Sequence, residues 1–288
     1  MPARRVIDSH VHLFDHRHVS YSWMPSRGAS LLKAHLPEDL LGSGLSTVVE
    51  GMVFVEAHAD GDRYLDEARF GRELMRRSPK VVAIVADAPV ERGAAVADDL
   101  AELRKLGGVK AIRRFPGNPS RSLDDDFLEG VRTVGRHGLA FEFGLLHGAL
   151  PYAVEIARRC PEVEFTLNHI ALPDIKHDLR EPWWSLIRDM GRLPNVVCKI
   201  SGAIAGADPK RWTPEQVLPY LRHAVDSFGF DRAMFGSDWP VSDLTHGYDT
   251  WVELVAAAAE GSSADEQEKL FRGTAIRRYG LDPAGLAA

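Results

Sequence analysis

Near its N-terminus the chain reads Val6-Ile7-Asp8-Ser9-His10-Val11-His12-Leu13, a short apolar run that contains two histidines spaced two residues apart. Because successive side chains of a strand point to opposite faces, Asp8, His10 and His12 are expected on one face. Three consecutive polar groups on one face do not suit an apolar core unless they bind a metal, a substrate or one another. The run therefore predicts a strand with functional histidines or with an ordinary hydrogen-bonded pair.

The rest of the chain repeats one unit, in which a short apolar strand pattern is followed by a helix pattern. Nearly continuous apolar strands are typical of parallel sheets that helices cover. The expected strands are residues 6–13, 47–56, 81–86, 109–115, 140–146, 164–170, 196–201 and 232–236, and the longer expected helices include 60–78, 90–106, 124–137, 150–160, 182–193, 214–228 and 263–279.

Eight such units match a closed barrel better than an open doubly wound sheet, whose Gly-x-Gly-x-x-Gly turn after the first strand is absent here. No Ser/Gly-rich linker divides the 288 residues. We therefore expect an α/β protein with a single (β/α)8 TIM barrel domain that spans residues 1–288.

Composition favours chemistry on small molecules. Hydrophobic residues make up 45% and charged residues 26% of the chain, and the net charge of −6 comes with no basic tail, so no nucleic-acid partner is expected. The two cysteines, Cys160 and Cys198, lack a Cys-x-x-Cys spacing, so neither a zinc knuckle nor a disulfide framework is expected. No apolar signal region precedes the first strand, and no run approaches the roughly 18 apolar residues of a membrane helix. We expect a cytoplasmic protein without a membrane partner.

In a barrel of this kind, functional residues gather at the carboxyl ends of the strands. Polar residues stand at most of these ends, and they are His10, His12, Glu56, His58, Arg113, Arg114, His147, Asn168, His169, Lys199, Ser201 and Asp238, with Trp239 next to the last. A barrel core has no need for imidazole, guanidinium and carboxylate groups at one strand after another. The convergence predicts a catalytic site, for which the candidates are His10, His12, His169 and Asp238.

Four further residues are candidates for substrate binding, namely Arg114, His147, Lys199 and Trp239. His147 borders a glycine-containing loop, where a surface position explains it equally well. Lys199 lies within an apolar strand, so it either reaches into the barrel to pair with a carboxylate or extends outward between helices. One of the adjacent pair Arg113 and Arg114 must face the helices, and we expect Arg114 to face the site because it is nearer the strand's end.

Two histidines and an aspartate form a nitrogen-and-oxygen set suited to Zn²⁺ or Mn²⁺, which would lower the pKa of bound water and polarise a carbonyl. The same groups support a route without metal, in which Asp238 takes a proton from water and histidines stabilise the oxyanion. The sequence leaves both routes open. A covalent mechanism is disfavoured, because there is no Gly-x-Ser-x-Gly elbow and no cysteine beside a histidine at an expected strand end.

Five motifs follow one another along the chain: Ile7-Asp8-Ser9-His10-Val11-His12, Gly108-Val109-Lys110-Ala111-Ile112-Arg113, Asn168-His169 followed by Pro173, Lys199-Ile200-Ser201-Gly202, and Phe235-Gly236-Ser237-Asp238-Trp239-Pro240. Together they resemble the amidohydrolase superfamily. They are most similar to its lactonase branch, which contains sugar-acid lactonases of the L-fuconolactonase and L-rhamnonolactonase types and pyrone-dicarboxylate lactonase.

The resemblance implies a (β/α)8 barrel that hydrolyses a lactone of a sugar acid or a pyrone carboxylate. Asp238 would be the general base, and His10, His12 and His169 would surround the carbonyl. It also implies that one divalent metal, Zn or Mn, binds at His10, His12 and Asp238, sometimes with Glu56, and is dispensable for turnover. The bridging lysine of two-metal relatives is not matched, since Lys110 lies at the start of its strand, so at most one metal is expected.

Two other functions stay open. One is a decarboxylase of the same superfamily, which a strict metal requirement would distinguish, and the other is a non-catalytic barrel that binds a small acid, against which the aspartate argues. Arg114, Arg121 and Arg211 fall at the catalytic end of the expected barrel. If they capture a carboxylate, an acidic lactone should be preferred over a neutral one.

Overall fold

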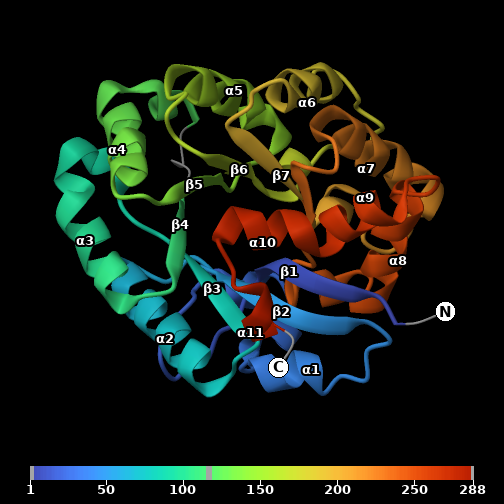
Figure 1. Ribbon diagram of the computed structural model, residues 1–288, viewed down its shortest axis with the longest axis horizontal. Coiled ribbons are helices and arrows are strands. Elements are labelled where there is room, and N and C mark those ends of the chain that lie inside the picture. Colours follow the sequence, from blue (N-terminus) through green and yellow to red (C-terminus); the bar gives the residue numbers. More distant parts are fainter. Residues whose placement is uncertain (1–2, 115–118, 287–288) are drawn as a thin grey trace.

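The computed structural model of the protein describes residues 3–114 and 119–286 (Figure 1). Eight parallel strands lie in one sheet in chain order. They are β1 (Arg5–Val11), β2 (Val48–Val55), β3 (Val81–Ala86), β4 (Val109–Arg113), β5 (Ala140–Phe143), β6 (Phe165–Leu167), β7 (Val196–Ile200) and β8 (Ala233–Phe235). The expected eight-stranded parallel (β/α)8 architecture is confirmed.

Backbone hydrogen bonds between the first strand and the segment after the last one close the sheet. Val11 forms a parallel bridge with Trp239. The Asp238 N–H donates to the His10 carbonyl over 2.9 Å, and the His12 N–H donates to the Trp239 carbonyl over 2.8 Å. Because of this closure, Asp238 lies beside His10 of β1 and His12, which follows β1.

Helices surround the strands on the outside of the barrel (Figure 1). They are α1 (Pro37–Leu41), α2 (Tyr64–Arg77), α3 (Ala97–Leu106), α4 (Asp125–Arg136), α5 (Leu150–Arg159), α6 (Trp183–Gly191), α7 (Pro214–Phe228), α8 (Tyr248–Ala258), α9 (Ala264–Glu268), α10 (Thr274–Tyr279) and α11 (Pro283–Leu286). The larger apolar cluster packs strands against helices and includes residues from Val6 to Phe271. A smaller cluster joins strand residues such as Val53 and Val85 to Tyr279 of α10.

A register shift in β1 changes which side chains share a face. Ile7 packs in the smaller apolar cluster, whereas Val6 and Val11 pack in the larger one, which strict alternation does not allow. The β1–β2 pairing shifts between Asp8 and Val11, as a β-bulge does. The shift lets Ile7 and His10 face the same side, contrary to the alternation expected from sequence.

Several elements are shorter or less regular than the sequence predicts. β6 stops at Leu167 because the next turn is left-handed, with φ of 55°, 47°, 61° and 44° at residues 169 to 172. The expected helix 90–106 is divided into a 3₁₀ segment, Val90–Val96, and α3, with φ of 63° at Gly93. The expected helix 263–279 contains a π segment, Lys269–Gly273. The expected end of the fourth strand at residue 115 lies outside the described residues.

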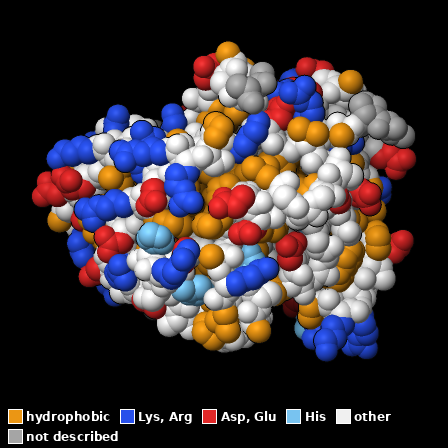
Figure 2. Space-filling model, turned by 90° about the horizontal axis from the view of Figure 1, so that it is seen from below, with side chains coloured by type: hydrophobic (Ala, Val, Ile, Leu, Met, Phe, Trp, Pro, Cys, Tyr) orange, Lys and Arg blue, Asp and Glu red, His pale blue; other side chains and the backbone are white. Residues whose placement is uncertain are grey.

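The molecular surface carries charges of both signs. Figure 2 shows basic and acidic side chains interspersed over one face, with apolar side chains among them. Some surface charges pair within one helix, as Arg69 does with Asp66 in α2. Among the described helices, none combines the length and the apolar character needed to cross a membrane.

Candidate active site

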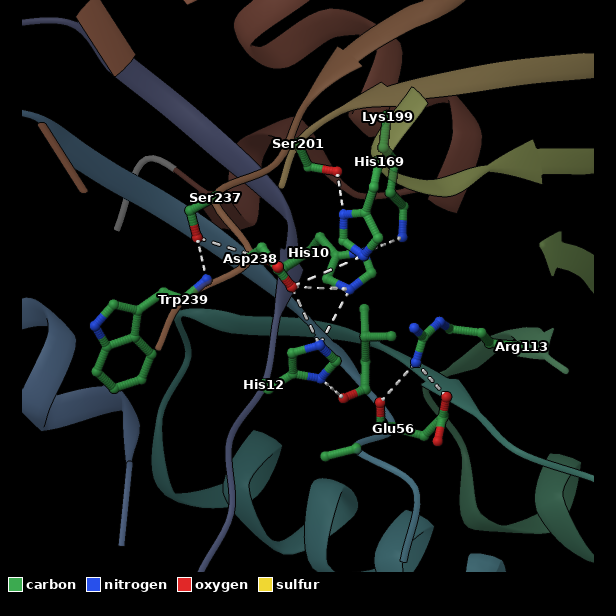
Figure 3. Close-up of polar contacts among 12 residues, drawn as sticks. His10, His12, Glu56, Arg113, His169, Lys199, Ser201, Ser237, Asp238 and Trp239 are labelled. Carbon is green, nitrogen blue, oxygen red and sulfur yellow. Dashed lines mark hydrogen bonds and ion pairs between the residues drawn. The ribbon is translucent and has the colours of Figure 1, made fainter. Parts of the chain in front are cut away.

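Four polar side chains meet at the carboxyl end of the barrel (Figure 3). Asp238 Oδ1 lies 3.7 Å from His10 Nε2, 3.3 Å from His12 Nε2 and 3.8 Å from His169 Nε2. All four residues are buried, with 7% exposure or less. The structure therefore brings together the four residues that the sequence proposes as catalytic, although they come from β1 and from the segments that follow β1, β6 and β8.

Two of these residues adopt a backbone conformation that is rare outside glycine. The φ angles are 65° at Asp238 and 55° at His169. Left-handed residues of this kind persist where the surrounding structure holds them, and they concentrate at functional sites. Around Asp238 the support comes from Asp8, whose Oδ1 accepts hydrogen bonds from Ser237 N at 2.9 Å and His10 N at 3.1 Å. Asp8 thus ties β1 to the segment that follows β8.

Hydrogen bonds fix the rings of the flanking histidines. His12 Nδ1 lies 3.0 Å from the Val55 carbonyl, which only accepts, so Nδ1 carries the hydrogen and a neutral His12 has a lone pair on Nε2. His169 Nδ1 lies 2.9 Å from Ser201 Oγ. Both rings consequently present Nε2 to Asp238.

Gly202 leaves the space that His169 and Asp238 occupy. A Cβ at this position would lie 2.6 Å from His169 Nδ1 and 3.1 Å from Asp238 Oδ2. The φ of Gly202 is 57°, which glycine adopts without steric cost. Two separate requirements, room and backbone conformation, therefore explain a glycine after Ser201.

Burial and mutual proximity set the charges of the cluster. Burial lowers the pKa of His169 to about 4, although Asp238 opposes the shift. Burial also lowers the pKa of His10 well below its usual value, and His169 and Lys199 add to the effect. Burial raises the pKa of Asp238, but His169 and His12 outweigh it and hold that pKa below its ordinary value. The arrangement favours neutral rings at His10 and His169 beside an ionised Asp238.

His10, His12 and Asp238 offer three ligand atoms that lie within 4.8 Å of one another. Neutral imidazole nitrogens and a carboxylate oxygen are ligands that Zn²⁺ accepts. The His12 Nε2 lone pair and Asp238 Oδ1 face each other at 3.3 Å, and a shared cation or proton would relieve the repulsion between these acceptors. The three residues therefore fit one divalent ion.

Glu56 is engaged elsewhere. Its Oε1 lies 2.5 Å from Arg113 Nη1, and its Oε2 accepts a hydrogen bond from the His58 N–H at 2.7 Å. Burial raises the pKa of Glu56, but His58 and Arg113 outweigh it and lower that pKa to about 2. Glu56, which the resemblance added to the metal ligands, lies outside the group of three and serves as the counter-ion of Arg113 instead.

The structure reverses the expected orientation of the two adjacent arginines. Arg113 is buried and faces the barrel interior, where Figure 3 shows it beside Glu56. It follows by two positions Ala111, a member of the smaller apolar cluster, so both lie on the same face. Arg114 instead pairs with Asp87 at 2.7 Å and with Glu91 at 2.5 Å. Strand parity decides the orientation, and nearness to the strand end does not.

The other three residues proposed for substrate binding occupy different places. Lys199 is fully buried and lies 2.6 Å from Glu142 Oε2, so its inward orientation is confirmed. Trp239 is buried, with its ring edge-on to His35. His147 is half-buried and its Nδ1 lies 2.9 Å from the Leu172 carbonyl, which links the segment after β5 to the left-handed turn after β6.

His246 is a residue that the sequence reasoning missed. It lies on the loop between β8 and α8, and its buried Nε2 has no hydrogen-bond partner among the described residues. Burial lowers its pKa to about 4, and Asp238 opposes that shift through its charge. No strand-end pattern marks this position, since it stands well beyond the end of β8.

Comparisons with known proteins agree with this architecture. An amidohydrolase family model matches residues 7–281. An L-fucono-1,5-lactonase from Burkholderia multivorans is 30% identical, with 96% of this chain and 97% of the relative covered. An L-rhamnono-gamma-lactonase from Scheffersomyces stipitis is 21% identical over 98% of this chain and all of the relative. A Burkholderia multivorans amidohydrolase structure with bound zinc has a TM-score of 0.83 and 28% identity, covering 96% of this chain and 99% of that one. This chain belongs to the amidohydrolase family.

Proposed function

We propose that the protein hydrolyses the cyclic ester of a neutral sugar lactone, with Asp238 as the general base. The observation that carries the proposal is the buried Asp238 carboxylate with three imidazole nitrogens at 3.3 to 3.8 Å. Such a group can take a proton from water next to a polarised carbonyl. The relatives named L-fucono-1,5-lactonase and L-rhamnono-gamma-lactonase support the choice of substrate class.

In the proposed reaction, Asp238 accepts a proton from water as the oxygen attacks the lactone carbonyl carbon. N–H groups of His10 and His169 stabilise the negative oxygen of the tetrahedral intermediate, because the N–H of His12 is already bonded to the Val55 carbonyl. The ring C–O bond then breaks, and the leaving oxygen takes the proton back from Asp238, which yields a hydroxy acid. A divalent ion, when bound at His10, His12 and Asp238, would add polarisation of the carbonyl.

The charges around the site support a neutral substrate. All the arginines considered for carboxylate capture already have an acidic partner: Arg114 has Asp87 and Glu91, Arg121 has Asp124 at 3.3 Å, and Arg211 has Asp208 at 3.1 Å. The buried Arg113 is neutralised by Glu56. A second carboxylate would have to compete with these pairs, which weakens the case for the acidic lactone considered from sequence.

We expect neutral 1,4- and 1,5-aldonolactones to be hydrolysed with a kcat/KM at least about tenfold above that of pyrone carboxylates, a difference of roughly 1.4 kcal/mol in transition-state binding. Proton release from a panel of both classes measures this. Arg114→Met is a matched control, because it removes a guanidinium that is already paired and should change both classes little. Preference for a pyrone carboxylate that Arg114→Met abolishes would contradict the neutral assignment.

Metal removal is expected to lower lactonase activity only in part. The purified protein should carry at most about one Zn²⁺ or Mn²⁺ per chain, because the described residues offer one set of three ligands. Metal content by elemental analysis, and activity before and after dialysis against a chelator, check this. Complete loss that added metal restores would show that the metal is required for turnover and would contradict the expectation that it is dispensable.

A further inference from the structure

A buried chain of hydrogen bonds links α10 to the catalytic histidines. Tyr279 donates its hydroxyl to Glu142 Oε1 at 2.8 Å, and Lys199 Nζ donates to Glu142 Oε2 at 2.6 Å. The same Nζ lies 3.4 Å from His10 Nδ1 and 5.8 Å from the centre of the Tyr279 ring. Tyr279, Glu142 and Lys199 have 2% exposure or less. Each of the three N–H groups of Lys199 thus has a neighbour to which it can point.

The directions of these bonds determine where His10 carries its hydrogen. An ammonium group paired with a carboxylate has donors and no acceptor, so His10 Nδ1 must accept from Lys199. In a neutral ring the hydrogen then resides on Nε2. That atom lies 3.3 Å from His12 Nε2, which can accept because His12 Nδ1 donates to the Val55 carbonyl. Every bond from Tyr279 to Val55 is consistent with this one assignment.

We propose that Lys199 is a positioning residue that holds His10 with its hydrogen on Nε2 and thereby weakens the binding of a divalent metal. The inference rests on the proposed function, in which His10, His12 and Asp238 are both the catalytic and the metal-binding set. Metal coordination by His10 Nε2 would move the hydrogen to Nδ1, where it would face the donors of Lys199 at 3.4 Å. Lys199 therefore keeps His10 available as a hydrogen-bond donor to the lactone oxygen.

The test measures Zn²⁺ affinity in a variant without the lysine. Lys199→Met alone would leave Glu142 buried without its counter-ion, so the variant is the double substitution Lys199→Met and Glu142→Gln. The metal-free protein is titrated with Zn²⁺ by calorimetry. We expect Zn²⁺ to bind the double variant roughly tenfold to a hundredfold more tightly, the range that corresponds to one hydrogen bond to a charged group.

Tyr279→Phe is the matched control. It removes a donor to the same carboxylate and leaves the contact between Lys199 and His10 in place. Its Zn²⁺ affinity should equal that of the unmodified protein, which separates the effect of Lys199 from a general loosening of the buried network.

Nitrogen-15 NMR of histidine-labelled, metal-free protein gives a second readout, with His10→Ala identifying the signals of this ring. The unmodified protein should show the hydrogen of His10 on Nε2. A folded double variant with unchanged or weaker Zn²⁺ affinity, or a His10 hydrogen on Nδ1 in the unmodified protein, would overturn the inference. If the double variant does not fold, the NMR result decides alone.

Neither readout needs a lactone. Tighter Zn²⁺ binding by the double variant, together with no lactone hydrolysis by the unmodified protein, would refute the proposed function and leave the role of Lys199 standing. Lactone hydrolysis by the unmodified protein, together with unchanged Zn²⁺ affinity of the double variant, would support the proposed function and refute the role of Lys199.

Discussion

Asp238→Asn is expected to lower kcat/KM for lactone hydrolysis by roughly 10² to 10⁴ while the barrel stays folded. The amide has nearly the same size as the carboxylate and can still lie among His10, His12 and His169, but it cannot accept a proton from water. The backbone contacts of this residue, including the 2.9 Å bond from its N–H to the His10 carbonyl, do not depend on the side chain. Initial rates from proton release measure the loss of kcat/KM, and a thermal unfolding curve shows whether the barrel stays folded.

Asp243→Asn is the control for this substitution. Asp243 lies on the same loop after β8 but is exposed, so the change removes a carboxylate that does not belong to the cluster. It should keep near-normal turnover. Near-normal turnover by Asp238→Asn itself would refute the assignment of the base.

Gly202→Ala should also have a large effect, through geometry and not through charge. The added Cβ would lie 2.6 Å from His169 Nδ1, so the ring or the loop must move. A displacement of about 1 Å in a catalytic site can reduce the rate about 100-fold, and we expect a loss of that order. A non-glycine residue in the left-handed region costs a further 1 to 2 kcal/mol or so of folding stability.

Gly280→Ala separates these two effects. Gly280 has a φ of 56°, close to the 57° of Gly202, but a Cβ there would meet only Lys110 Nζ, at 3.9 Å. This control should lose a similar amount of stability in urea unfolding while its kcat/KM stays unchanged. Equal turnover by both alanine variants would show that Gly202 does not set the geometry of the site.

The fold could be predicted because its signal is repeated. Each apolar strand is followed by a helix, and eight repeats leave few alternatives to a barrel. The boundaries were less accurate where the chain leaves the sheet to place a side chain. Phe165–Leu167 is shorter than the expected 164–170 because the left-handed turn at His169 ends it, and no local pattern marks such a turn.

The site was predictable to the extent that strand ends converge. His10, His12, His169 and Asp238 needed only the rule that the carboxyl ends of parallel strands meet. The choice between Arg113 and Arg114 depends on strand parity and requires the register of β4. The contact between Lys199 and His10 depends on how side chains of β7 and β1 pack inside the barrel. The sequence of either strand alone does not determine this packing.

The bond from Ser237 N to the Asp8 carboxylate joins residues that are 229 positions apart. Before β8 docks against β1, Asp238 has not been brought close in space to His10 and His12. A folding intermediate with an open barrel therefore has no catalytic site, however much native helix it contains. Contacts of such long sequence separation form late and slowly, so the recovery of activity during refolding should follow the closure of the barrel and not the earlier collapse of its core.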